Sequence, residues 1–98
     1  ALKYFKVSAY TVEFSSLQEM QNLITNKSVL IIAVDLQKLY GETGGHYIVL
    51  YDNRITIDDR GAYREIAVAD SLKPPNTWLS AVRIWNALKH YKALRVFK

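Results

Sequence analysis

The sequence contains no cysteine, so these 98 residues can form no disulfide bond, no thiolate metal site and no thiol nucleophile of their own. Histidines are scarce as well, since only His46 and His90 occur, and they do not follow a zinc-binding spacing such as a helical pair four residues apart. We therefore expect no metal and no cofactor. Without cysteines the redox compartment stays undecided, because a cytosolic chain and an unbridged secreted domain look alike.

Long hydrophobic runs are also missing. The longest, residues 29–34, is far shorter than the roughly 20 residues that a membrane helix needs. The mixed residues 1–7 lack the apolar stretch of a signal peptide. We expect a soluble protein with no membrane span and favour the cytoplasm. The start at Ala1 fits either removal of an initiator methionine or a position inside a longer polypeptide.

Acidic side chains are absent after Asp70, although the formal net charge of the whole chain is only +4. The basic residues of this last part are Lys73, Arg83, Lys89, Lys92, Arg95 and Lys98. This bias predicts a positive surface, with Arg83, Lys89 and Lys92 as candidate contacts to an acidic partner or to nucleic acid. A solvated face of a small basic domain is the alternative explanation.

Hydrophobic residues make up half of the chain, and this content excludes intrinsic disorder. The length suits one domain, residues 1–98. Local patterns predict an α+β fold in which an antiparallel sheet is flanked by two helices. The expected elements are a possible helix tail at 1–6, a strand at 7–14, a helix at 17–25, a central strand at 29–34 covered on both faces, a polar loop at 35–45, strands at 46–52 and 55–58 joined by a turn at 53–54, a strand at 63–69 after a turn at 59–61, a helix from 76 or 77 to 88, and an edge strand at 93–97.

Two details support these helices. Ser16 and Glu19 have the spacing of a capping box, in which side chains satisfy the free backbone amides of a helix start. In the second helix an apolar stripe at helical spacing is expected to face the core, and the two tryptophans are interpreted as core anchors. The stripe consists of Trp78, Ala81, Val82, Trp85 and Leu88.

One pair of residues, His46 and Asp70, suggests a catalytic site. His46 opens one strand after Gly44 and Gly45, and Asp70 closes another 24 positions later. Residues at matching ends of antiparallel strands lie at the same end of a sheet, so the two side chains can meet and form a base with its orienting carboxylate. The two glycines, with Tyr47, are the candidate substrate-binding residues, because glycine lets a peptide backbone approach closely. Taken singly, a histidine after glycines and an aspartate after a strand are typical turn or cap residues.

These segments resemble a papain-like cysteine peptidase of the C39 type, found in bacteriocin-processing transporters and related stand-alone domains. The matching segments are residues 14–24, residues 29–34, the Gly-His-apolar strand at 45–51, the strand-Asp element at 68–71, and the helix and strand that follow. The resemblance covers nearly the whole chain and implies the sheet half of a papain-like fold. It also implies that His46 is the general base and Asp70 its orienting partner.

In that family the cysteine begins a helix near the N-terminus after an oxyanion-stabilising glutamine, and both positions would precede Ala1. We therefore expect either an N-terminally truncated peptidase or a degenerate relative that binds peptides without catalysis. Ubiquitin-like-protein peptidases offer a second resemblance, with the order His, Asp, Cys, in which the cysteine would follow Lys98. The strand-like residues 94–97 and the long interval from His46 to Asp70 favour the C39 order.

The sequence thus predicts a cysteine-peptidase-like domain that keeps His46 and Asp70, lacks the nucleophile and has no turnover alone. Its expected partner is a peptide or a protein substrate. The alternative is a non-enzymatic module that binds an acidic partner or nucleic acid through its basic C-terminal helix. A sheet without its helical half would expose apolar surface, so we also expect association with another copy or with a missing N-terminal segment.

Overall fold

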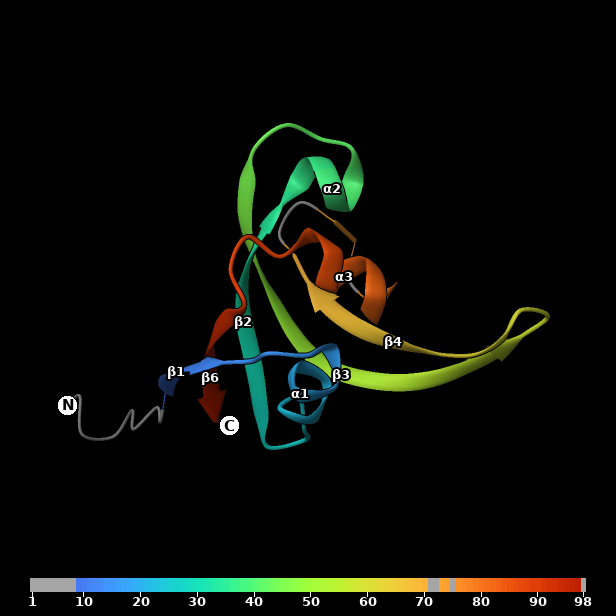
Figure 1. Ribbon diagram of the computed structural model, residues 1–98, viewed down its shortest axis with the longest axis horizontal. Coiled ribbons are helices and arrows are strands. Elements are labelled where there is room, and N and C mark those ends of the chain that lie inside the picture. Colours follow the sequence, from blue (N-terminus) through green and yellow to red (C-terminus); the bar gives the residue numbers. More distant parts are fainter. Residues whose placement is uncertain (1–8, 71–72, 75, 98) are drawn as a thin grey trace.

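A computed structural model describes residues 9–70, 73–74 and 76–97 (Figure 1). It confirms the α+β class, with an antiparallel six-stranded sheet and three helices in the described part of the chain, one helix more than predicted. The elements in chain order are β1 (Ala9–Glu13), α1 (Leu17–Asn22), β2 (Ser28–Asp35), α2 (Leu36–Tyr40), β3 (Gly45–Asp58), β4 (Gly61–Ala69), β5 (Thr77–Ser80), α3 (Ala81–Ala87) and β6 (Lys92–Phe97). The helix tail predicted at 1–6 lies outside the described residues.

The strands are arranged in the order β1-β6-β2-β3-β4-β5, and every neighbouring pair is antiparallel. The C-terminal strand β6 was predicted at an edge, but it lies between β1 and β2. The prediction was wrong because charged residues in a strand do not require an edge: Ala93 is buried while Lys92 and Leu94 on either side of it are exposed. The edges of the sheet are β1 and β5.

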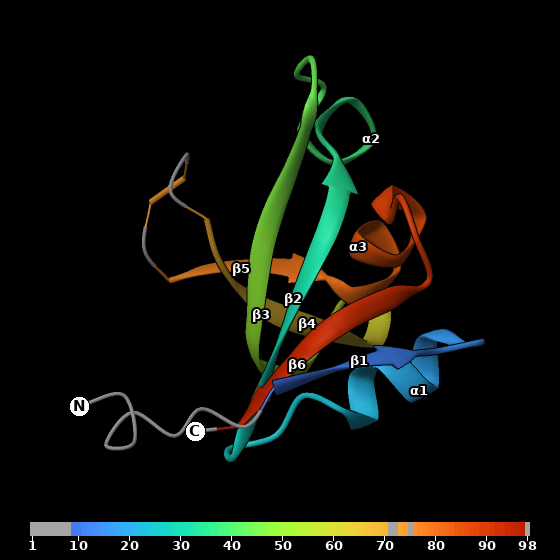
Figure 2. The ribbon, with the colours of Figure 1, turned by 90° about the vertical axis from the view of Figure 1, so that its left-hand side faces the viewer.

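All three helices lie on one side of the sheet around β2 (Figure 1). Residues of β2 alternate strictly between buried and partly buried, and Leu30, Ile32 and Val34 belong to the buried core. The opposite face, seen in Figure 2, carries no helix of the described chain and leaves Ile31 and Ala33 partly exposed. The expectation that this strand is covered on both faces was therefore wrong, because an unbroken apolar run also suits a strand with one open face.

The polar loop predicted at 35–45 contains α2. The Asp35 side chain accepts a hydrogen bond from the Gln37 amide at 2.9 Å and so caps the first turn of this helix. Gly41, with a φ of 73°, ends it in the left-handed conformation. Leu36 and Leu39 are buried. The short segment is thus helical because it has caps at both ends and an apolar side.

The helix predicted from 76 or 77 to 88 is in fact a short strand followed by a helix. Ser80 caps α3 by accepting from the Arg83 amide at 3.1 Å. The buried side of α3 consists of small and branched residues, Ala81, Ile84 and Ala87. Of the predicted stripe, Ala81 is buried and Trp85 and Leu88 pack against the core, but Val82 is 57% exposed, so the stripe was wrong at that position. Its spacing assumed that the helix begins near Asn76, whereas backbone pairing with β4 keeps residues 77–80 extended.

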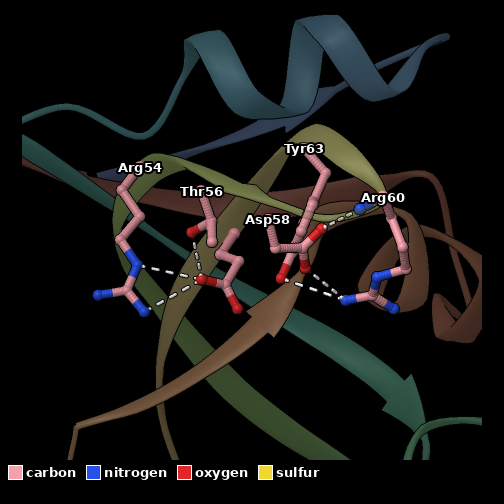
Figure 3. A network of polar contacts seen from close by, with 6 residues as sticks. Arg54, Thr56, Asp58, Arg60 and Tyr63 are labelled. Atoms are coloured by element: carbon pink, nitrogen blue, oxygen red, sulfur yellow. Dashed lines mark hydrogen bonds and ion pairs between the residues drawn. The ribbon is translucent and has the colours of Figure 1, made fainter.

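A turn was predicted at 53–54, but β3 continues to Asp58 and forms one long hairpin with β4, with a register shift between Leu50 and Asp52. The outer half of this hairpin projects from the rest of the molecule (Figure 1). It is held by cross-strand polar contacts, in which Glu65 accepts from Thr56 at 2.5 Å and from Arg54 at 3.0 Å (Figure 3). Asn53, which suggested the turn, instead donates through its side-chain amide to the Ile24 carbonyl at 2.9 Å.

The first helix begins as predicted, since the Ser16 hydroxyl accepts from the Glu19 amide at 3.2 Å. The Glu19 carboxylate accepts from Ser15, one residue earlier than in a standard capping box. The helix ends at Asn22 instead of residue 25. No helix in the described ranges is long and apolar enough to cross a membrane.

Candidate functional site

The pairing of β3 with β4 brings His46 and Asp70 to the same face of the sheet. Leu50 lies opposite Val68, and both are buried among the helices. Side chains alternate along a strand, so His46, four residues before Leu50, and Asp70, two residues after Val68, share this face. His46 and Asp70 are not directly opposite each other but are offset by two residues along the strands, a diagonal separation that long side chains can bridge.

The two side chains meet directly. His46 Nε2 lies 2.8 Å from Asp70 Oδ1. The Asp70 side chain is fully buried, whereas the His46 side chain is 24% exposed. The carboxylate is therefore shielded from water behind an imidazole that solutes can reach.

This contact also determines which ring nitrogen carries the proton. An ionised carboxylate only accepts hydrogen bonds, so the short contact to Asp70 assigns the proton to Nε2 of a neutral His46. Its Nδ1 then holds the free lone pair and makes no hydrogen bond within the described part of the chain. The arrangement can accept a proton at Nδ1 while Asp70 keeps the ring in place.

Two further residues surround Asp70. Lys73 donates its backbone N–H to the Asp70 carbonyl at 3.0 Å. Tyr40, at the end of α2, has a buried hydroxyl. Burial, together with the negative charge of the nearby Asp70, raises the pKa of Tyr40 to about 12. Tyr40 is thus a neutral neighbour of the buried carboxylate.

The candidate substrate-binding residues do not form one surface. Gly44, with a φ of 114°, turns the chain into β3, and its carbonyl accepts from the Leu36 amide at 2.9 Å. Tyr47 is 71% exposed and, one residue after His46, points to the open face of the sheet. There it borders a shallow hollow of about 250 Å³ beside Ile31 and Leu94. Tyr47 therefore lies on the opposite face from the histidine.

The three basic candidates are also divided. Arg83 donates its Nε to the Leu39 carbonyl at 2.9 Å and thereby joins α3 to α2. Lys89 and Lys92 line a separate hollow of about 600 Å³, together with two acidic residues, Glu13 and Glu19. The basic residues therefore do not form a single helix face.

Sequence reasoning missed Tyr40, Lys73 and the structural role of Arg83. A signal for Tyr40 was present, because Asp35 and Gly41 bracket a segment with leucines at 36 and 39, as expected of a short capped helix. Lys73 and Arg83 gave no such signal. Their contacts join segments that are distant in the sequence.

The described residues contain no cluster of three or more His, Asp or Glu side chains placed to hold a metal ion. Comparison with known proteins finds no matching family model, no similar curated protein and no similar solved structure. The chemistry of the site therefore follows from its own residues.

Proposed function

We propose that this chain is the base-bearing part of a cysteine-peptidase-like domain, similar to the C39 peptidases, with His46 as the general base and Asp70 as the residue that orients it. The observation that carries the proposal is the 2.8 Å contact between His46 Nε2 and a fully buried Asp70 carboxylate. Thiol catalysis uses this combination, in which an accessible imidazole is held in one orientation and tautomer by a third group.

The chemistry requires a thiol from another segment or another polypeptide, because this sequence has no cysteine. His46 Nδ1 would take the thiol proton, and the thiolate would form a bond to the peptide carbonyl carbon. The imidazolium would return the proton to the leaving amine as the C–N bond breaks, and water would hydrolyse the resulting thioester with His46 again as base. Alone, the chain is expected to bind peptide without turnover.

The test is reconstitution. The chain is mixed or fused with the polypeptide segment encoded directly before it, and hydrolysis of fluorogenic peptides is measured. A segment that supplies cysteine at a helix start should produce hydrolysis, and His46→Gln should lower it by roughly 10² to 10⁴, the usual contribution of general acid–base catalysis. A preceding segment without cysteine would leave the chain a noncatalytic peptide-binding relative, with peptide affinity as its activity.

The matched control is His90→Gln, because His90 is the other histidine of the sequence and lies in the exposed loop after α3. It should leave hydrolysis unchanged. Hydrolysis by the reconstituted pair that survives His46→Gln would contradict the assignment of the base.

A second candidate function, a non-enzymatic module for an acidic partner, has its own supporting observation. The ammonium group of Lys89 lies over the backbone of Gly45, where a Cβ would come within 2.4 Å of Nζ. Within the described residues neither Lys89 nor Lys92 forms an ion pair. These two cations would be the contacts of an anionic ligand, although they share their hollow with Glu13 and Glu19.

A further inference from the structure

The proposed mechanism gives no task to Tyr40, although its buried hydroxyl lies beside the His46–Asp70 pair. In the described chain no direct hydrogen bond of ordinary geometry reaches this hydroxyl, and the side chain that acts on it most is Asp70. A neutral phenol is a donor that suits a carboxylate. A buried hydroxyl without such a partner is destabilising, which favours this pairing.

The ring of Tyr40 is held in place by two cations. The Lys73 ammonium lies 4.2 Å from the ring centroid, and the Arg83 guanidinium lies 5.8 Å from it. Lys73 also forms an ion pair with Glu42 at 2.5 Å. Because the backbone N–H of the same Lys73 donates to the Asp70 carbonyl, one residue contacts both Asp70 and the ring of Tyr40.

The helix that carries Tyr40 is itself fixed. Asp35 caps its start, Gly41 ends it in the left-handed conformation, and Arg83 donates to the carbonyl of Leu39, the residue before Tyr40. The hydroxyl of Tyr40 is therefore held by a helix that has hydrogen bonds to residues of both β2 and α3. Such support is what keeps a reactive pair in one geometry.

We propose that Tyr40 is a positioning residue of the His46–Asp70 pair, and that its hydroxyl donates to the Asp70 carboxylate and keeps it in the orientation that accepts from His46 Nε2. The inference rests on the proposed function, because there the orientation of the imidazole decides reactivity. Tyr40 touches neither the substrate nor the reacting atoms. It acts on His46 through Asp70.

The test is Tyr40→Phe, which removes the hydroxyl and keeps the ring between its two cations. Ring ¹⁵N chemical shifts of His46 are measured at a pH where imidazole is neutral, together with the exchange of the Nε2 proton with water. The wild type should show the Nε2-protonated tautomer. In the variant this proton should exchange roughly tenfold faster and the other tautomer should appear, because a hydrogen bond to a charged group has been lost.

Two variants complete the experiment. Tyr91→Phe is the control, because Tyr91 is 61% exposed and its loss should change neither measurement. Asp70→Asn separates the two hypotheses: if it leaves the tautomer of His46 unchanged, the pair itself and the proposed function fail. If Asp70→Asn changes the tautomer and Tyr40→Phe does not, only the role of Tyr40 is overturned.

A second measurement needs no substitution of Tyr40. With ¹³Cζ-labelled tyrosine, the pKa of Tyr40 should lie near 12 in the wild type, and Asp70→Asn should lower it, because the charge and the hydrogen-bonding carboxylate that hold the proton are gone. An unchanged pKa of Tyr40 in Asp70→Asn would contradict the contact.

Discussion

At the scale of single residues, the two glycines before His46 differ in what they do. Gly44 has a φ of 114°, a conformation that side chains rarely tolerate, and a Cβ there would have ordinary space, 4.0 Å from Leu36. Gly45 has no such constraint, but a Cβ would meet the flexible end of Lys89 at 2.4 Å. Gly44 is thus required by the backbone, whereas Gly45 makes room for a side chain.

We therefore predict that the same substitution, glycine to alanine, destabilises the protein at one of these positions and has almost no effect at the other. Gly44→Ala should lower the free energy of unfolding by about 1 to 3 kcal/mol through backbone strain. Gly45→Ala should change it by less than about 0.5 kcal/mol, because the Lys89 side chain can move aside. Urea unfolding of both variants measures the difference. Equal destabilisation by the two would contradict this assignment.

The contact between His46 and Asp70 was only partly predictable from the sequence. Strand alternation and strand ends placed both residues at one end of the sheet, and this much came from local pattern. That β3 and β4 are direct neighbours, with no strand between them, was not predicted, because the continuous pairing past residues 53–54 depends on cross-strand contacts. Tyr40 was missed because it comes near Asp70 only in the folded chain, where α2 lies close to the end of β4.

At the scale of elements, the projecting hairpin depends on its polar contacts. Arg54 and Thr56 both donate to the same oxygen of Glu65, Oε1 (Figure 3). The Arg54 guanidinium also lies 3.9 Å from the ring centroid of Trp78 in β5. The hydrogen bond from Thr56 is the main reason that the pKa of Glu65 is lowered, with the Arg54 hydrogen bond and charge adding to it against the effect of burial. The network thus links three strands.

Thr56→Val should destabilise the protein by about 1 kcal/mol near neutral pH, because the network is partly exposed. A carboxylate with a lowered pKa stabilises the fold above its ordinary value, 4.5, and this contribution is lost as the pH falls through the folded value. The difference between wild type and variant should therefore shrink in acid. Denaturant midpoints across this pH range measure it, and Thr56→Ser, which keeps the hydroxyl, is the control. A difference that stays constant in acid would exclude the Glu65 contact as its cause.

At the scale of the whole molecule, the charge is unevenly placed. The chain carries a formal net charge of +4, and every charged side chain after Asp70 is basic. Lys89 and Lys92 lie together, while Arg83 is committed to the carbonyl of Leu39. An anionic partner would therefore approach beside β6 and the start of β3, away from α3.

Salt dependence separates the two candidate functions. If the chain binds an acidic partner, the affinity for a Glu-rich peptide should fall steeply with ionic strength, and Lys89→Glu should weaken it. Lys27→Glu makes the same charge change in the turn before β2 and is the control. If the chain is peptidase-like, affinity for an uncharged peptide should be nearly independent of salt. Stronger binding of single-stranded DNA than of either peptide, with a steep salt slope, would instead indicate a nucleic-acid partner.

Local sequence patterns were sufficient for the α+β class, for most strands, for the Ser16 cap and for the shared sheet end of His46 and Asp70, because alternation, capping and turn chemistry act over a few residues. The packed structure alone decided that β6 lies inside the sheet, that one face stays open, and that Tyr40 and Lys73 surround Asp70. These features join segments far apart in the sequence, and their formation depends on which surfaces can be buried together.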